Sequence, residues 1–445
     1  MEKIGTDKFL DTYPVNHFRW ENGFEALLVD NPISPVAAYL TLYGVGSAAE
    51  GDRERGLAHF FEHMMFRETA TLADGDFDRI MSQIGGVGLN ASTAYDATTY
   101  HVNVPAAHLG RVVELEADRM VNLRLSPELI QRERGAVLGE IKMYRDMPSE
   151  QHWDALMAAA FPSHPYRHPI IGYVEQVEAF SDQDFAAFYR KHYAPNRAVV
   201  VIAGGFDERS VLEMLDRAYG DLPRGAAPGA AQGDSAPAAA APAPQEAAAN
   251  GHRRVELTHD KISTESLTLA YPTPGLTHRD LPALILLSAL LAAGQSSPLY
   301  RRIVLKGLAT HVSASQLETE MMLTSPGLFL IDVSLKHGVA AEVAEEAIAE
   351  VFGTLLRDGV QEQDLERARN QIKLSFYSGM RTNMNLARQI GGYRMACGDA
   401  LFSQRLLQAL AGVDPAELIR TLTGYLIDRP GVVAVQRPAA GAGAA

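Results

Sequence analysis

The sequence has almost no cysteine, no long apolar run and no excess of basic residues. Cys397 is the single cysteine in 445 residues, so an intramolecular disulfide and a cysteine-based metal site are both excluded. The longest apolar run, residues 281–294, is shorter than the roughly 18 to 20 residues that cross a membrane. It predicts a buried core helix rather than a membrane span. The 54 acidic and 40 basic residues give a net charge of −14, which argues against nucleic acid or an anionic membrane as the main partner.

The remaining composition is that of a globular protein. Apolar residues make up 47% of the chain and charged residues 21%. A length of 445 residues suggests two or more domains, each able to bury a core. The first 20 residues lack the apolar core of a signal peptide. We therefore expect either a cytoplasmic protein or the mature form of an exported one.

An Ala/Pro/Gly-rich stretch divides the chain into two halves of similar size. It has almost no large apolar residues and predicts a flexible linker. We predict an N-terminal domain over residues 1–224, a linker over 225–251 and a C-terminal domain over 252–445.

Both halves combine period-2 strands with long helices. Strands are predicted at 25–29, 36–42, 89–104, 197–204, 267–271, 327–335 and 431–436, and helices at 58–67, 127–144, 281–291 and 362–377. Residues 126–140 can be aligned with 362–376, which places Glu140 opposite Phe376. We expect an α+β fold of two homologous domains, duplicated within the chain, each with a mainly antiparallel sheet and helices on one side.

The stretch His59-Phe60-Phe61-Glu62-His63 is the most informative motif. Residues at positions i and i+4 of a helix lie on one face, so His59 and His63 can bind one ion with Glu62 beside them. Zinc favours imidazole and carboxylate ligands, and a catalytic site keeps one position open for water. The order His-x-x-Glu-His is that of the inverted zincins.

A third ligand is needed, and a carboxylate on another helix suits it. Seventy-six residues separate His63 from Glu140, which lies in a predicted helix, and Glu133 precedes Glu140 by two turns on nearly the same face. From there Glu133 could support a ligating histidine. Glu114 and Glu116 are alternatives for the third ligand, because the spacing alone does not choose among these acids.

These residues together resemble the pitrilysin/insulinase family of inverted zinc peptidases, which includes the mitochondrial processing peptidase. Further similar stretches are Gly56-Leu57-Ala58, Gly85-Gly86, Asn90-Ala91, Glu133-Arg134-Gly135, His164-Pro165-Tyr166, Tyr193-Ala194-Pro195-Asn196 and Gly307-Leu308-Ala309. The resemblance covers both halves. It implies one zinc ion per chain, bound by His59, His63 and Glu140, with Glu62 as general base and Glu133 as a supporting acid.

The resemblance also implies a zinc-dependent endopeptidase that acts on oligopeptides or unfolded segments. Zinc lowers the pKa of bound water to about 7, and Glu62 would move the proton of that water to the leaving amine. In this family a peptide adds as a strand to the sheet edge. The corresponding residues are Asn90, Ala91, Ser92 and Thr93.

One departure from the family concerns an Arg and a Tyr, seven residues apart, that hold substrate and stabilise the oxyanion. Ile303 and Thr310 occupy these two positions, and Arg301 and Arg302 lie out of register. We therefore hypothesise that this chain is the zinc-bearing subunit of a heterodimer, in one pair or two, and half of a clamshell. A homologous partner would supply the missing pair, and a homodimer is the less favoured assembly.

Two other readings come from different functional classes. One is a non-catalytic structural subunit resembling the core proteins of the respiratory bc1 complex; an intact set of zinc residues argues against it. The other is a peptide-binding or chaperone-like protein with a structural zinc, against which the free Glu62 argues. Bacterial two-subunit relatives are often exported, so we expect the periplasm, with the cytoplasm as the alternative.

Overall fold

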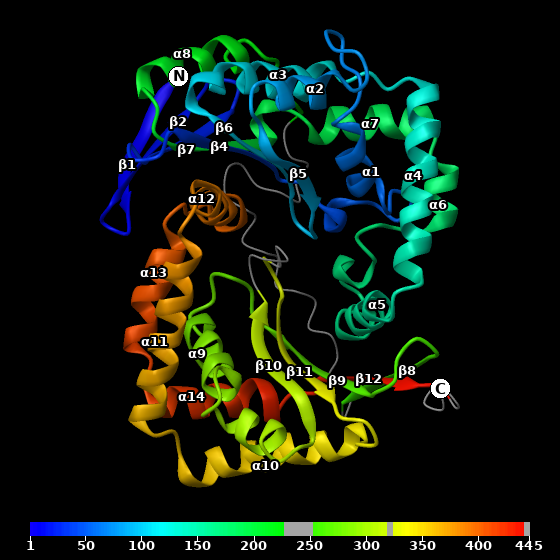
Figure 1. The fold of residues 1–445 in the computed structure, drawn as a ribbon, viewed down its shortest axis with the longest axis vertical. Helices are drawn as coiled ribbons and strands as arrows, with labels where there is room; N and C mark the ends of the chain where they lie inside the picture. The colour runs from blue at the N-terminus through cyan, green and yellow to red at the C-terminus, as the bar shows by residue number, and fades with distance from the viewer. Residues whose placement is uncertain (227–251, 318–323, 440–445) are drawn as a thin grey trace. The chain divides into compact units, whose positions relative to one another are not determined.

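The computed structural model describes residues 1–226, 252–317 and 324–439, and these form two compact units. The first unit contains residues 1–142, 169–226 and 379–404, and the second contains 143–168, 252–378 and 405–439. Each unit therefore includes a segment from the other half of the sequence (Figure 1). Most of the predicted linker, residues 227–251, lies outside the described residues. The predicted domain limits stay a prediction.

The first unit is built on a seven-stranded sheet in the order β1-β2-β3-β7-β4-β6-β5. Neighbouring strands are antiparallel except β3 and β7, which are parallel. The strands are β1 (Glu2–Phe9), β2 (Tyr13–Arg19), β3 (Glu25–Asp30), β4 (Val36–Tyr43), β5 (Val87–Thr93), β6 (Thr98–Pro105) and β7 (Ala198–Gly204). Its helices are α1 (Leu57–Met64), α2 (Asp76–Gln83), α3 (Leu109–Asn122), α4 (Pro127–Arg145), α6 (Val174–Ala179), α7 (Asp182–His192), α8 (Glu208–Tyr219) and α12 (Asn383–Cys397).

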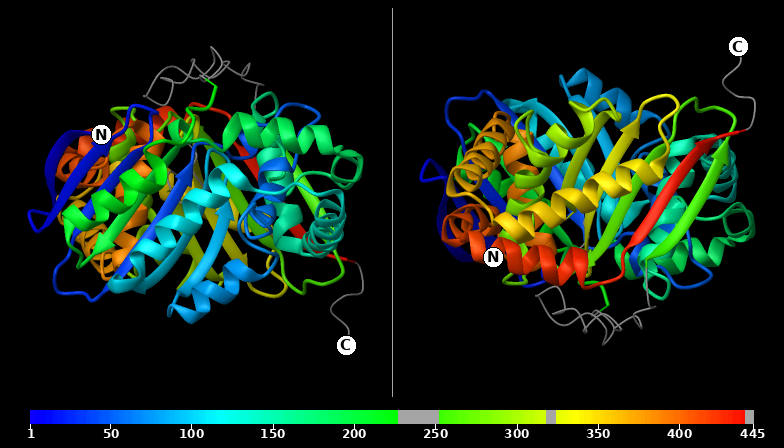
Figure 2. Two further views of the ribbon diagram at one scale, coloured as in Figure 1. Left: turned by 90° about the horizontal axis from the view of Figure 1, so that it is seen from above. Right: turned by 90° about the horizontal axis from the view of Figure 1, so that it is seen from below.

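The centre of this sheet is covered on both faces. Every residue of β7, a run of small and β-branched side chains, is buried, as expected for a strand packed on two sides. Helices α3 and α8 lie over one face (Figure 2, left). On the other face α12 approaches closely, because a Cβ at Gly391 would lie 2.7 Å from side-chain atoms of Leu42 and Val201. The prediction that helices cover only one side of the sheet was therefore wrong for this sheet.

The second unit has a five-stranded sheet in the order β10-β11-β9-β12-β8, antiparallel except for β12 and β8. Its strands are β8 (Arg253–His259), β9 (Ser266–Thr273), β10 (Ala309–Leu317), β11 (Gly327–Leu335) and β12 (Val432–Pro438). Its helices are α5 (Pro148–Ala160), α9 (Leu281–Ala292), α10 (Ala341–Asp358), α11 (Glu362–Gly379), α13 (Phe402–Ala409) and α14 (Pro415–Thr421). α10 and α14 cross one face (Figure 2, right), and α5 lies on the opposite one.

Most predicted elements are present, and the fold class is confirmed as two units of mixed sheet and helix, with mainly antiparallel pairing. The helices predicted at 127–144 and 281–291 match α4 and α9 to within one residue, and the strand at 327–335 is β11. The strand predicted at 89–104 was wrong. It is the hairpin of β5 and β6, because the chain reverses between Thr93 and Thr98. The sequence pattern did not reveal β1, β2, β8 and β10.

The duplication is visible in two buried arginines, one in each unit. Arg134 of α4 donates to the carbonyls of Val177 and Phe180, just before the residue that caps α7. Arg369 of α11 donates to carbonyls of Leu410 and Val413, just before the residue that caps α14. Pairing these arginines shifts the predicted register of the repeat by one residue. Glu140 then corresponds to Ser375 rather than Phe376.

No described helix combines the length and the apolar character that a bilayer crossing requires.

Candidate metal centre

Helix α1 carries the His-x-x-Glu-His motif and is fixed by its apolar side. Phe60, Phe61 and Met64 are fully buried in the core of the first unit. Gly56, the residue just before the helix, adopts φ +101° and has no side chain to cap the first turn. The capping is supplied by the buried carboxylate of Glu50, which accepts the N–H groups of Gly56 (3.0 Å) and Ala58 (2.7 Å).

The predicted ligands His59, His63 and Glu140 lie together, and they are the one such group found among the described residues. Their ligand atoms are all within 4.8 Å of one another. The Glu140 Oε2 atom is 3.3 Å from His63 Nε2 and 3.7 Å from His59 Nε2. Ligands of a tetrahedral zinc with bonds of about 2.0–2.1 Å are roughly 3.4 Å apart. The donor set and its spacing therefore fit a zinc ion.

The protonation of His59 also fits a metal ligand. Burial, with a smaller contribution from the neighbouring His63, lowers the pKa of His59 to about 3. The imidazole is therefore neutral near pH 7 and keeps a lone pair for a metal.

Glu133 lies behind His63. Its carboxylate is 97% buried, and its Oε2 atom is 3.7 Å from His63 Nδ1. Arg67 holds it from the other side, with Nε 3.0 Å from Oε1 and Nη2 3.1 Å from Oε2. Burial opposes ionisation of Glu133, but His63 and Arg67 outweigh it and keep its pKa below the usual value. An anionic Glu133 suits the support of a ligating imidazole.

Glu62 lies beside the ligand group but does not belong to it. Its Oε2 atom accepts a hydrogen bond of 2.7 Å from the Thr93 hydroxyl. Burial raises the pKa of Glu62, while Thr93 and His63 act against that rise. A half-buried carboxylate with a raised pKa is suited to taking up and releasing a proton.

The four residues predicted to bind substrate lie on β5, the edge strand of the first sheet. Asn90 and Ser92 are exposed, and Ser92 bonds to Thr99 of β6 at 2.8 Å. Ala91 is buried. Thr93 faces the metal centre through Glu62, a contact that the sequence did not predict. The role of Arg67 was also missed, although it lies four positions after His63 in the predicted helix over 58–67 and that spacing was a usable signal. In the structure α1 ends at Met64, before Arg67.

The two positions where the resemblance leads us to expect an Arg and a Tyr hold an isoleucine and a threonine. Ile303 is fully buried in the core of the second unit. Thr310 is exposed and donates to the carbonyl of Ser334. Of the nearby arginines, Arg302 pairs with Glu350 at 2.6 Å.

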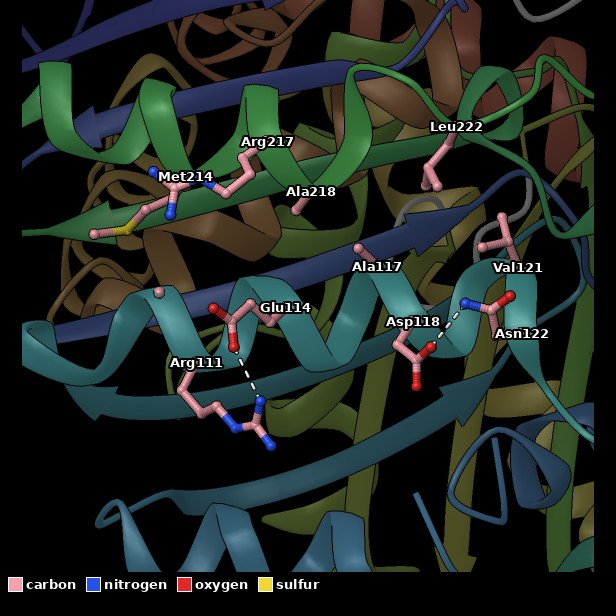
Figure 3. A pocket seen from close by; sticks show the side chains of 11 residues that line it. Arg111, Glu114, Ala117, Asp118, Val121, Asn122, Met214, Arg217, Ala218 and Leu222 are labelled. Carbon is pink, nitrogen blue, oxygen red and sulfur yellow. Dashed lines mark hydrogen bonds and ion pairs between the residues drawn. The ribbon is translucent and has the colours of Figure 1, made fainter. Parts of the chain in front are cut away.

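A separate groove of about 560 Å³ lies between α3 and α8 (Figure 3). Its wall combines apolar side chains such as Met214 and Leu222 with the exposed Arg111–Glu114 ion pair. None of the residues that line it belongs to the ligand group.

The fold and the cluster define a sheet-and-helix protein with a histidine–carboxylate group that could hold a metal ion. Residues 26–173 match the family described as insulinase (peptidase family M16), and residues 179–372 match its partner domain, described as the peptidase M16 inactive domain. The chain belongs to this family of metallopeptidases. The ligand group lies within the first match, and the described part of the second match holds no comparable group.

Named relatives agree with this assignment. The chain is 28% identical to the zinc protease PqqE of Helicobacter pylori over 79% of this chain and 77% of that protein. It is 24% identical to a probable mitochondrial-processing peptidase subunit beta of Arabidopsis thaliana, over 92% and 75% of the two chains. A crystal structure of a protease from Helicobacter pylori superposes with a TM-score of 0.85 at 25% identity, covering 95% of this chain and 99% of that one.

Proposed function

We propose that this protein is a zinc-dependent endopeptidase that cleaves oligopeptides or unfolded segments. The observation that carries the proposal is the convergence of His59, His63 and Glu140 around one point, with Glu62 next to it. A bound zinc would supply an activated water and polarise the scissile carbonyl. Glu62 would take the proton of that water and deliver it to the departing amine. Glu133, held anionic by Arg67, would keep His63 in place.

The substrate would bind along β5. An edge strand presents unpaired backbone groups, and an extended peptide can add to them with little sequence preference. Thr93, at the end of this strand, bonds to Glu62. A peptide paired with β5 would therefore pass the general base, with Asn90, Ala91 and Ser92 as neighbouring contacts.

The chain would work as one subunit of a heterodimer. Oxyanion stabilisation needs a donor, and in the described part of the second unit Ile303 and Thr310 occupy the positions expected to provide it. The name of the Arabidopsis relative, a subunit beta, is in line with this arrangement. A periplasmic location remains an expectation from the resemblance.

Replacing Glu62 by Gln tests the proposal directly. The amide keeps the size of the side chain but cannot accept the water proton, so we expect peptide cleavage to fall by about 10²- to 10⁴-fold. Zinc content, measured by atomic absorption, should stay near one ion per chain because Glu62 is outside the ligand group. Unchanged cleavage would overturn the role of Glu62. Absence of zinc from the unaltered chain would favour the alternative, a non-catalytic structural subunit.

A further inference from the structure

We propose that α6 is a brace that sets the distance between the two metal-binding helices, and that Arg134 is its main positioning residue. The inference rests on the proposed function, because it takes His59, His63 and Glu140 as zinc ligands. The first two ligands are on α1 and the third is on α4, so the geometry of the site depends on how these helices are held. Figure 1 shows α6 beside α4.

Arg134 joins α4 to the C-terminal end of α6. The guanidinium is buried and donates to the carbonyls of Val177 (3.0 Å), Glu178 and Phe180 (2.7 Å). A cation is favoured at a helix C-terminus, where carbonyls lack partners within the helix. Glu140 follows Arg134 by six residues on the same helix, so this anchor fixes its position.

Gln176 joins α6 to the loop that precedes α1. Its Oε1 atom accepts the N–H of Arg55 at 2.9 Å, and its Nε2 atom donates to the carbonyl of Asp52 at 3.2 Å. The backbone just before α6 also approaches the backbone of this loop closely. A Cβ added at Gly56 would lie 2.8 Å from the Ile171 carbonyl oxygen, closer than real Cβ contacts allow.

The same loop is fastened to the first turn of α1. The Glu50 carboxylate accepts the N–H groups of Gly56 and Ala58, directly before His59. A continuous series of polar contacts therefore leads from α4 through Arg134, α6 and Gln176 to α1. None of these contacts involves a metal ligand side chain, so the brace exists without the metal.

The chain supplies a matched control in its second unit. Arg369 of α11 holds carbonyls of Leu410 and Val413 in the same way, and it is as buried as Arg134. Glu133 and Glu140 correspond there to Ala368 and Ser375, and no ligand group is found among the described residues of that unit. A lysine at either position keeps the charge but loses the forked geometry that reaches several carbonyls.

The experiment measures metal binding rather than activity. The affinity of the full-length protein for Co²⁺ is determined by competition with a chelator for the unaltered chain, Arg134→Lys, Gln176→Leu and Arg369→Lys. The Co²⁺ absorption spectrum and urea unfolding of the metal-free proteins are recorded alongside. Supporting groups of metal sites typically contribute about 10- to 100-fold in affinity. We expect Arg134→Lys to bind Co²⁺ about 10- to 100-fold more weakly than the unaltered chain, with an altered absorption spectrum. Arg369→Lys should bind Co²⁺ with an affinity within about twofold of that of the unaltered chain.

Two results would overturn the brace. One is wild-type affinity in both Arg134→Lys and Gln176→Leu while the proteins remain folded. The other is an equal loss in Arg369→Lys, which would mean that affinity follows general stability. If the lysine variant at position 134 does not fold, the milder Gln176→Leu decides. Failure of the unaltered chain to bind Co²⁺ would instead overturn the proposed function, and the brace with it.

Discussion

At the scale of single residues, the Glu133 carboxylate lies between His63 and Arg67. Its Oε2 atom is 3.7 Å from His63 Nδ1, and its two oxygens contact Nε and Nη2 of Arg67. A buried carboxylate without such a cation would take up a proton and lose its attraction for an imidazole N–H. Arg67 therefore keeps Glu133 ionised, and Glu133 orients His63.

The role of Glu133 predicts the effect of its neutral analogue. Glu133→Gln removes the charge that faces His63 and leaves Arg67 without its partner, so we expect zinc affinity to fall about 10- to 100-fold. Competition with a chelator measures this. Glu128→Gln is the control, because Glu128 lies in the exposed first turn of the same helix. Equal affinities for the two variants would contradict the supporting role.

The residue types of the site were accessible from the sequence, but their contacts were not. The His59–His63 spacing and the distance to Glu140 predicted the group that lies together in the structure. Spacing could not separate Glu140 from Glu114 or Glu116, because the choice depends on how α3 and α4 pack. Glu116 in fact pairs with the buried Arg119 at 2.5 Å. Glu114 is exposed and pairs with Arg111.

At the scale of secondary-structure elements, α12 is joined to the first sheet by a buried ion pair. Arg394 of α12 donates to both carboxylate oxygens of Glu25 on β3, at 2.8–3.0 Å. Burial of Glu25 opposes its ionisation, but hydrogen bonds from His17 and Arg394 outweigh burial and hold its pKa at about 2. This pair anchors a helix that arrives from the far half of the sequence.

The Glu25–Arg394 ion pair predicts that the free energy of unfolding depends on pH. The pKa of Glu25 is lower in the folded chain than the usual value of about 4.3, so the stability that ionised Glu25 adds is complete above that pH and is lost as the pH falls towards 2. This addition to the free energy of unfolding is at most about 3 kcal/mol. We expect Glu25→Gln to be less stable than the unaltered chain at pH 6 and to lose less stability between pH 6 and pH 3, measured by urea unfolding. Glu114→Gln, at an exposed ion pair, is the control. Identical losses in Glu25→Gln and the unaltered chain would contradict the assignment.

At the scale of the whole molecule, the chain has two similar units, and the described residues place a ligand group in the first. The positions in the second unit that would complete the site hold a core isoleucine and a threonine bonded to a strand. Under the proposed function, catalytic groups for the oxyanion would come from a homologous partner chain.

Assembly with such a partner should restore activity. Removing an oxyanion donor costs about 10²- to 10³-fold in rate. We expect the purified chain to cleave a fluorogenic peptide slowly, and the addition of a homologue that contains the Arg and Tyr to raise the rate by that factor. The Glu62→Gln chain mixed with the same homologue should stay inactive, which locates the chemistry in this subunit. Full activity of the chain alone would rule out the heterodimer.

The sequence by itself predicted the residue types of the candidate site and most of the strands, but only four of the α-helices. Helical periodicity places His59, Glu62 and His63 on neighbouring positions of one helix, and alternation of apolar residues identifies strands such as β11. These are local properties, encoded within a few residues. Tertiary structure alone decided which carboxylate completes the group, which charges hold it, and that α5 and α12 each join the unit of the other half. Those outcomes depend on contacts between segments far apart in the chain, whose packing no local pattern specifies.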